Sequence, residues 1–211
     1  MAKLYFRYGT VGSAKTLNLL AVAYNYRQQG KQVLLIKPDI DTRFGKDRIK
    51  SRAGLELPVD ILVASTTNLV DRDWNNIHCA LVDEAQFLSP QHIDELRLIT
   101  LEKHIPVICY GLRTDFRSCL FPGAARLMEL ADSIEEVKAT CHFCNRKSIM
   151  NLKHFNGKAT LEGPAVQLGT EEAYYAACYR CYVEKLKEVS ECFCAEDRMK
   201  KESESCLCHP S

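Results

Sequence analysis

The stretch that decides the fold is "YFRYGTVGSAKTLNLL", from Tyr5 to Leu20. The apolar segment from Lys3 to Tyr8 predicts a buried strand, and the segment from Lys15 to Gln29 has apolar residues at helical spacing. Between them lies a loop of small residues that ends in Lys-Thr. A strand, such a loop and a helix in this order are typical of the P-loop, G-x-x-x-x-G-K-[ST], whose backbone N–H groups converge on phosphate oxygens. We therefore predict a phosphate-binding loop over residues 9–16.

One position of this loop departs from the pattern, because Ala14 stands where the second glycine is expected. If that position requires a positive φ, alanine costs about 1–2 kcal/mol there, and Gly12 could supply the flexibility instead. A small-residue turn that caps an ordinary helix is the alternative. In the phosphate-binding interpretation Lys15 neutralises the β- and γ-phosphates, and the Thr16 hydroxyl ligates Mg²⁺. The loop residues predicted to bind ATP are Gly9, Thr10, Val11, Gly12, Ser13, Ala14, Lys15 and Thr16.

The rest of the first 138 residues alternates apolar strands with helices. Further strands are predicted at 32–38, 60–65, from 79 and at 106–112, and a helix at 89–104 with Ser89 as its cap and Pro90 at its first position. Near-continuous apolar strands of this kind predict an α/β fold, a P-loop (RecA-like) parallel sheet flanked by helices. We expect a nucleotide-binding domain over 1–138, a small zinc-binding domain over 139–186, and a disordered tail over 187–211.

Two adjacent carboxylates end the strand in "ALVDEAQF", residues 80–87. Successive side chains of a strand point to opposite faces, so the two acids should have separate tasks. Beside a P-loop, Asp83 is suited to hold magnesium and Glu84 to accept a proton as a general base. Two solvated acids at a strand end are the alternative.

Cysteines suggest a metal site in the C-terminal part. "CHFC" (Cys141, Cys144) and "CYRC" (Cys178, Cys181) are two C-x-x-C pairs, with residues 145–177 between them. Four thiolates complete a closed tetrahedral zinc site of the structural kind. Buried free cysteines are the alternative, and His142 could replace one ligand. No role is assigned to the tail cysteines, which are Cys192, Cys194, Cys206 and Cys208.

Charge and hydropathy exclude several other classes. Lys and Arg total 28, and Asp and Glu total 27, so no bulk field attracts nucleic acid or an anionic membrane. We see no signal peptide and no apolar run long enough to span a bilayer. The sequence therefore predicts a cytoplasmic protein with no nucleic-acid and no membrane partner.

Taken together, the motifs resemble a known family. The P-loop, "DTRF" (41–44), "DEAQF" (83–87), "YGLRTDFR" (110–117), "FPGAARLMELAD" (121–132) and "GPAVQLGTEEAYYAACYRC" (163–181) occur in the order found in thymidine kinases of the zinc-containing, P-loop type. The resemblance runs from about Lys3 to Tyr182. It implies transfer of a phosphoryl group from ATP, with Mg²⁺, to the 5′-hydroxyl of thymidine. It also implies a homotetramer and inhibition by thymidine triphosphate.

The same resemblance assigns roles to residues. Glu84 matches the catalytic base, Asp83 the magnesium-associated acid, and Asp41 with Arg43 a pair near the phosphates. A loop called the lasso, 165–174, is expected to hold the base mainly through its backbone. The residues expected to contact the nucleoside are Phe87, Leu112, Phe116, Ala165, Val166, Gln167, Leu168, Gly169 and Tyr174.

Two functions of other classes stay open at this point. One is an ATP-dependent nucleic-acid module with a RecA-like core and a zinc ribbon, which salt-sensitive DNA binding would support. The other is a nucleotide-binding regulatory protein with an altered P-loop, which Ala14 slightly favours.

Overall fold

The computed structural model describes residues 1–164 and 174–188. Its main sheet has six strands in the order β5-β2-β6-β7-β1-β8, and every pair of neighbours is parallel. The strands are β1 (Leu4–Tyr8), β2 (Gln32–Pro38), β5 (Ile61–Val63), β6 (Ile77–Val82), β7 (Val107–Gly111) and β8 (Ser133–Glu136). This confirms the predicted α/β fold with a parallel sheet.

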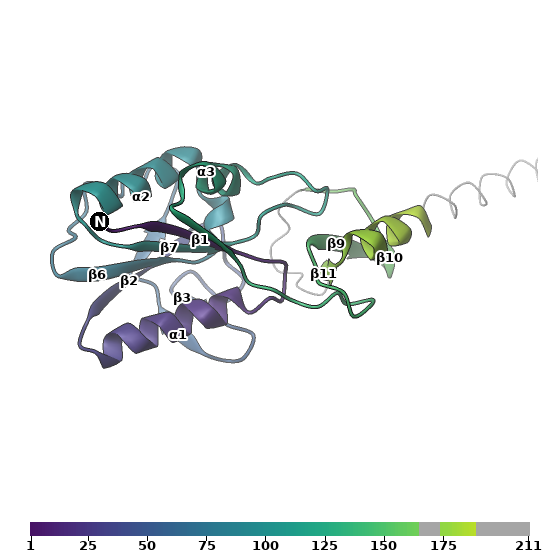
Figure 1. The fold of residues 1–211 in the computed structure, drawn as a ribbon, viewed down its shortest axis with the longest axis horizontal. Coiled ribbons are helices and arrows are strands. Elements are labelled where there is room, and N and C mark those ends of the chain that lie inside the picture. Colours follow the sequence, from purple (N-terminus) through teal and green to yellow (C-terminus); the bar gives the residue numbers. More distant parts are fainter. Residues whose placement is uncertain (165–173, 189–211) are drawn as a thin grey trace, which may run out of the picture.

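Helices cover both faces of this sheet (Figure 1). On one face lies α1 (Lys15–Gln28), whose Leu19, Leu20 and Ala23 belong to one buried cluster. On the other face lie α2 (Pro90–Glu102) and α3 (Pro122–Leu130), which contribute to a second, larger cluster. Because both faces are buried, the central strands are apolar along their whole length, which is why they stand out in the sequence.

Sequence patterns located the longer elements well. The Ser89 side chain accepts a hydrogen bond from the His92 N–H, and Pro90 begins α2, as its sequence predicts. The sequence analysis did not identify β8, the helix α3, or the antiparallel pair β3 (Arg48–Lys50) and β4 (Glu56–Pro58). These strands are short and largely exposed, so they lack the apolar run that marks a buried strand.

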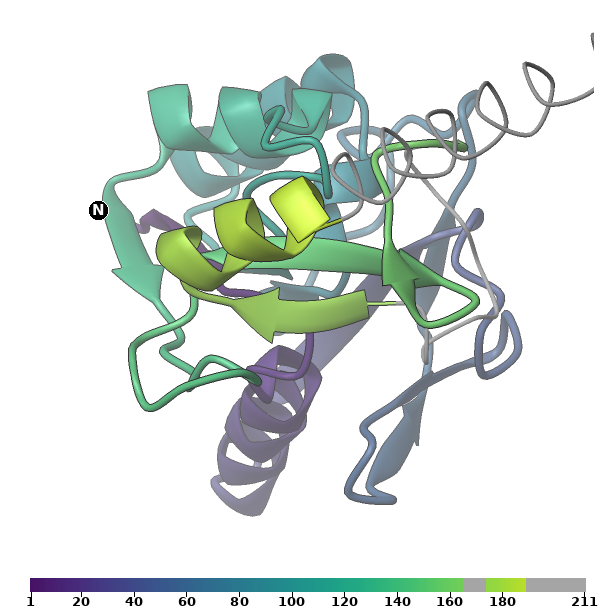
Figure 2. The ribbon, with the colours of Figure 1, turned by 90° about the vertical axis from the view of Figure 1, so that its right-hand side faces the viewer.

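A second, smaller sheet follows in the C-terminal part. It is antiparallel in the order β10-β9-β11, formed by β9 (Met150–Phe155), β10 (Lys158–Ala159) and β11 (Tyr174–Ala177), and a helix at 179–188 packs beside it (Figure 2). It has its own buried cluster, which includes Met150, Leu152 and Tyr182. The division into domains at 138 and 186 stays a prediction, and most of the predicted tail lies outside the described residues.

None of the helices in the described part of the chain combines the length and apolar character needed to cross a membrane.

Candidate functional site

The predicted phosphate loop leaves the carboxyl end of β1 and leads directly into α1. Gly9 permits a close approach, because a Cβ at this residue would lie 2.4 Å from the Ser13 Oγ and 2.5 Å from the Val137 carbonyl oxygen. The loop closes on itself through a hydrogen bond from the Ser13 N–H to the Thr10 carbonyl, 3.2 Å long. The sequence "GTVGSAKT" is therefore a compact loop at a helix N-terminus, the arrangement that binds phosphate.

Backbone angles settle how the loop accommodates its alanine. Ala14 has φ 63° and ψ 25°, in the left-handed region, and Gly12 has φ 77°. Gly12 thus does not replace the missing glycine, since both positions have a positive φ. Ala14 adopts a conformation that is strained for a residue with a Cβ, at a cost of about 1–2 kcal/mol. Such strain is often found at functional sites, where the surrounding structure imposes it.

Lys15 is buried beneath the loop. Its ammonium group donates to the carbonyl oxygens of Gly9 (3.2 Å) and Thr10 (2.8 Å) and to the Ser13 Oγ (3.3 Å). Burial lowers the pKa of Lys15 to about 8, although Glu84 and Asp83 act in the opposite direction. An ammonium group that is already buried and held by its own loop is well suited to bind a phosphate oxygen.

Thr16 and Asp83 form the predicted magnesium pair. The Thr16 hydroxyl donates to both carboxylate oxygens of Asp83, at 3.3 and 3.2 Å. Burial, together with the neighbouring Glu84, raises the pKa of Asp83 to about 7. A hydroxyl and a carboxylate at this separation fit adjacent positions around an octahedral Mg²⁺, whose ligands lie at about 2.0–2.1 Å. These two residues would hold the ion, which would neutralise charge on the transferring phosphoryl group.

Glu84 is fixed by neighbours on both of its oxygens. One oxygen accepts a hydrogen bond from the Arg43 guanidinium and forms a salt bridge with it. The other oxygen accepts a hydrogen bond of 2.6 Å from the Gln86 side-chain amide. Burial alone would raise the pKa of Glu84, but Arg43 and Lys15 outweigh it and hold that pKa below its usual range. The carboxyl group is therefore ionised at neutral pH, as a proton acceptor must be.

Asp41 and Arg43 extend this network. The Arg43 Nε donates to Asp41 at 2.8 Å, and the Lys37 ammonium lies 3.3 Å from the other Asp41 oxygen. Burial opposes ionisation of Asp41, yet the bonds from Arg43 and Lys37 keep its pKa below the ordinary value. Asp41 thus orients Arg43, which in turn orients Glu84.

These groups share a cavity of about 240 Å³. Of the predicted site residues, it is lined by Val11, Gly12, Ser13, Ala14, Lys15, Thr16, Asp41, Arg43, Asp83, Glu84 and Leu112. The structure therefore gathers four separate sequence motifs around one hollow, at the carboxyl ends of parallel strands where such sheets bind ligands.

Several residues of this site were missed by the sequence analysis. Lys37 is almost fully buried near the end of β2. A lysine in an apolar strand is rarely buried without a partner, so its position in the sequence could have predicted a nearby acid such as Asp41. Gln86 connects Glu84 to the Leu112 N–H, which donates to its Oε1 at 2.9 Å. Residues 49–53, which comprise the last two residues of β3 and the three that follow, also line the cavity. No pattern in the sequence predicted that this segment belongs to the site.

Only some of the residues predicted to contact the nucleoside lie in the described part of the chain. Phe87 packs edge-on against Phe121, with ring centres 5.6 Å apart, at the margin of the main core. Phe116 is 1% exposed and lies 6.2 Å from the Tyr174 ring. Residues 165–169 of the expected lasso lie outside the described residues. Base contacts by these side chains stay predictions.

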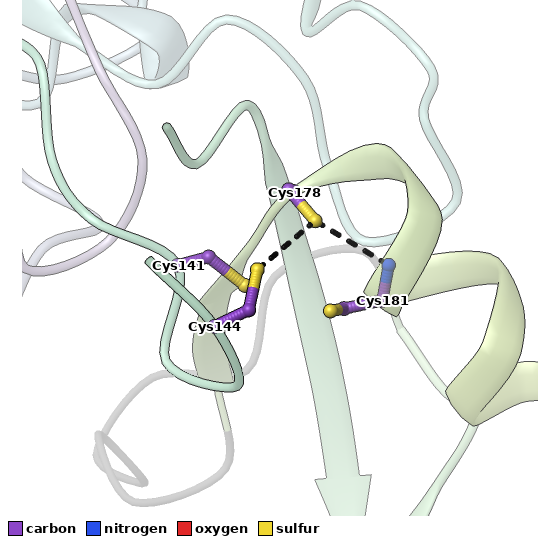
Figure 3. A group of neighbouring side chains, drawn as sticks. All are labelled: Cys141, Cys144, Cys178 and Cys181. Atoms are coloured by element: carbon purple, nitrogen blue, oxygen red, sulfur yellow. Dashed lines mark hydrogen bonds between the residues drawn. The ribbon is translucent and has the colours of Figure 1, made fainter. Parts of the chain in front are cut away.

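The four cysteines of the two C-x-x-C pairs form a cluster (Figure 3). All four sulfur atoms lie within 4.8 Å of one another, and those of Cys144 and Cys178 are 3.7 Å apart. A Zn–S bond of about 2.3 Å separates the corners of a tetrahedron by about 3.8 Å. The Cys181 N–H donates to the Cys178 sulfur and lowers the pKa of that thiol to about 7. The cluster therefore fits zinc, and His142 instead stacks on Tyr175 with ring centres 4.2 Å apart.

Comparisons with known proteins agree with this geometry. A family model described as thymidine kinase matches residues 2–182. Thymidine kinases of Lactiplantibacillus plantarum and Zymomonas mobilis are each 42% identical to this chain, over 184 and 194 residues. The first match covers 86% of this chain and 96% of its relative, and the second covers 90% and 100%. A thymidine kinase of Enterococcus faecalis is also 42% identical, with 86% and 95% covered.

Among solved structures, the Pif1 helicase of Candida albicans matches 64% of this chain and 36% of its own, with 10% identity and a TM-score of 0.39. A likeness this weak bears on neither fold nor function. Since the family model spans most of the sequence and the relatives match it along nearly their full lengths, this chain belongs to the thymidine kinase family.

Proposed function

We propose that this chain transfers the γ-phosphoryl group of ATP to the 5′-hydroxyl of thymidine, producing the monophosphate for deoxynucleotide salvage and DNA synthesis. Deoxyuridine is expected to serve as a second acceptor. Family membership supports the reaction class. The observation that carries the mechanism is that Lys15, Asp83 and Glu84 line one cavity. No comparison favours the nucleic-acid module, and the balanced charge of the chain also argues against it.

Transfer is direct and in line, without a covalent enzyme intermediate. The 5′-oxygen forms a bond to the γ-phosphorus as the bond to the β-phosphate oxygen breaks, and the hydroxyl proton passes to Glu84. The phosphate loop and Lys15 position the triphosphate and offset its charge. Mg²⁺ bound by Thr16 and Asp83 would supply further charge neutralisation.

Arg43 has a specific part in this scheme. Its guanidinium bridges Asp41 and Glu84, and it keeps the Glu84 carboxyl ionised at neutral pH. The same charge holds the carboxylate in one position at the cavity wall, so the acceptor hydroxyl meets a fixed base. Positioning of this kind contributes more to phosphoryl transfer than does covalent chemistry.

Four finer features are proposed on the cysteine cluster, the family resemblance and the sequence. The cluster is proposed to hold structural zinc, which has no open coordination position and so takes no part in the chemistry. A homotetramer and feedback inhibition by thymidine triphosphate are inferred from the family resemblance. A cytoplasmic location is inferred from the sequence.

The test is a transfer assay with labelled ATP against a panel of nucleosides, with and without a chelator. We expect Glu84→Gln to bind both substrates and to turn over at least about 10²-fold more slowly, because it removes the proton acceptor. The glutamine keeps only one of the two oxygens that accept hydrogen bonds from Arg43 and Gln86. Glu135→Gln, on exposed β8, is the matched control and should be unaffected. Near-normal turnover by Glu84→Gln would refute the role of the base. ATP turnover indifferent to every nucleoside would refute the proposed function.

A further inference from the structure

The helix at 179–188 contacts the loop that carries Phe116. The Tyr182 hydroxyl donates a hydrogen bond of 2.6 Å to the Phe116 carbonyl oxygen. The Ser118 hydroxyl donates in turn to the Tyr182 oxygen at 3.3 Å. Tyr182 is 6% and Phe116 is 1% exposed, so water does not readily replace the bond between them. The helix thus holds the main chain of a residue that is predicted to contact the nucleoside.

The loop at 113–120 is a turn that keeps its own shape. It connects β7 to α3, and its two ends meet at an isolated antiparallel bridge. Within the turn, the Asp115 carboxylate accepts hydrogen bonds from the N–H groups of Arg117 and Cys119, both at 2.9 Å. Because these bonds lie inside the turn, they do not fix its place relative to the rest of the molecule. Contacts from other segments must do so.

The segment that holds the Phe116 carbonyl also lies against the Phe116 ring. The centre of that ring is 6.2 Å from the centre of the Tyr174 ring, and Tyr174 is the first residue of β11. This strand ends at Ala177, just before the helix that carries Tyr182. One continuous stretch of chain therefore contacts Phe116 twice, at its ring and at its carbonyl oxygen. Both rings are predicted to contact the nucleoside.

Tyr182 is itself a fixed point. It directly follows Cys181 of the cysteine cluster, and its N–H donates to the Cys178 carbonyl at 3.0 Å. Its side chain belongs to the buried cluster of the second sheet, together with Leu152. The turn that it contacts is only a connection between a strand and a helix. The hydrogen bond therefore positions the turn more than it positions the tyrosine.

We propose that Tyr182 is a positioning residue for thymidine: its hydroxyl fixes the Phe116 main chain and so holds the Phe116 ring beside Tyr174, where both rings are expected to contact the base. The inference rests on the proposed function, because it assumes that thymidine is the acceptor. Tyr182 acts through Phe116 and does not itself touch the nucleoside. Neither Tyr182 nor Phe116 is among the described residues that line the cavity beside the phosphate loop. ATP binding should therefore not depend on this bond.

The test compares Tyr182→Phe with Tyr179→Phe, which removes the same hydroxyl from an exposed tyrosine of the same helix. For Tyr182→Phe we expect the KM and the dissociation constant for thymidine to rise about 5-fold, if the loss of one buried hydrogen bond is transmitted to the ligand. The dissociation constant for ATP, measured by calorimetry without thymidine, should change by less than about 2-fold. Tyr179→Phe should bind both substrates as the unmodified chain does.

Zinc content and circular dichroism establish that Tyr182→Phe is folded. In folded protein, a thymidine dissociation constant that rises by less than about 2-fold overturns the inference. An equal rise for ATP also overturns it, because a general loss of structure would weaken both substrates together.

Hydrogen exchange of the unmodified chain supplies a reading that needs no variant. Thymidine should slow amide exchange in the helix at 179–188 together with the turn at 113–120. Protection confined to the turn overturns the inference. If the unmodified chain neither binds nor phosphorylates thymidine, the proposed function fails instead, so the two failures are distinguishable.

Discussion

The cavity beside the phosphate loop and the cysteine cluster differ in how charge is compensated. In the cavity, Glu84 lies against Arg43, and Asp41 lies against both Arg43 and Lys37, so the chain itself supplies the cations. In the cluster, four thiols face one another within 4.8 Å (Figure 3). Thiolates so close repel one another unless a divalent cation lies between them. The first site therefore needs no ion to balance its charges, whereas in the second a bound zinc ion would balance the charges of the ionised thiols.

The largest effect should come from breaking the cluster. We expect Cys178→Ser to lose zinc and to unfold the second sheet, because the binding free energy of a structural zinc, about 10–16 kcal/mol in small zinc peptides, is coupled to folding. Metal analysis and limited proteolysis after residue 138 would measure this. Cys119→Ser is the control, since that thiol is exposed and outside the cluster, and it should alter stability by no more than about 0.5 kcal/mol. Full zinc content in Cys178→Ser would contradict the assignment.

An intermediate effect concerns Asp83, whose pKa is raised to about 7 by burial and by Glu84. The folded chain keeps this proton where the unfolded chain has lost it, so the associated stability is present below about pH 4 and is lost as pH rises through 7. Magnesium needs the ionised carboxylate. We therefore expect apparent magnesium affinity to weaken by up to about tenfold for each pH unit below 7.

Thermal unfolding with and without MgCl₂ at pH 6, 7 and 8 would show this trend as a larger magnesium-dependent rise of Tm at pH 8. Asp83→Asn serves as the reference, because it removes the titrating group and should respond equally weakly at all three values. A magnesium response of the same size at pH 6 and pH 8 in the unmodified chain would argue against Asp83 as the ligand.

The smallest effect is expected at Ala14. Its φ of 63° suits glycine, so Ala14→Gly should relieve strain of about 1–2 kcal/mol and lose about 0.5–1 kcal/mol to backbone entropy. The net gain of about 0.5–1 kcal/mol corresponds to a rise in Tm of roughly 1–4 °C for a chain of this size. Ala21→Gly, at an exposed position inside α1, should do the opposite and lower stability by about 1 kcal/mol. A fall in Tm for both variants would show that Ala14 is not strained.

The contrast between the two sites also explains what could be predicted. The phosphate loop is one contiguous segment with a fixed pattern, and the cysteine pairs have metal-ligand spacing, so both were found from residue type and order. The predicted strands before and after the loop were correct because buried parallel strands are apolar throughout. The short strands β3, β4 and β8 were missed because exposed strands carry no such signal.

By itself, the sequence determined where the longer strands and helices of the main sheet lie along the chain. It also located the phosphate loop, the two acids at the end of β6 and the four thiols. Only the tertiary structure decided that Arg43 pairs with Glu84, that Lys37 is buried against Asp41, and that Asn151 holds the Val11 N–H. A sequence motif can be recognised when the residues that form one site lie close together in the chain. Contacts between residues far apart in the chain depend on how strands and loops are packed, and no local pattern carries that information.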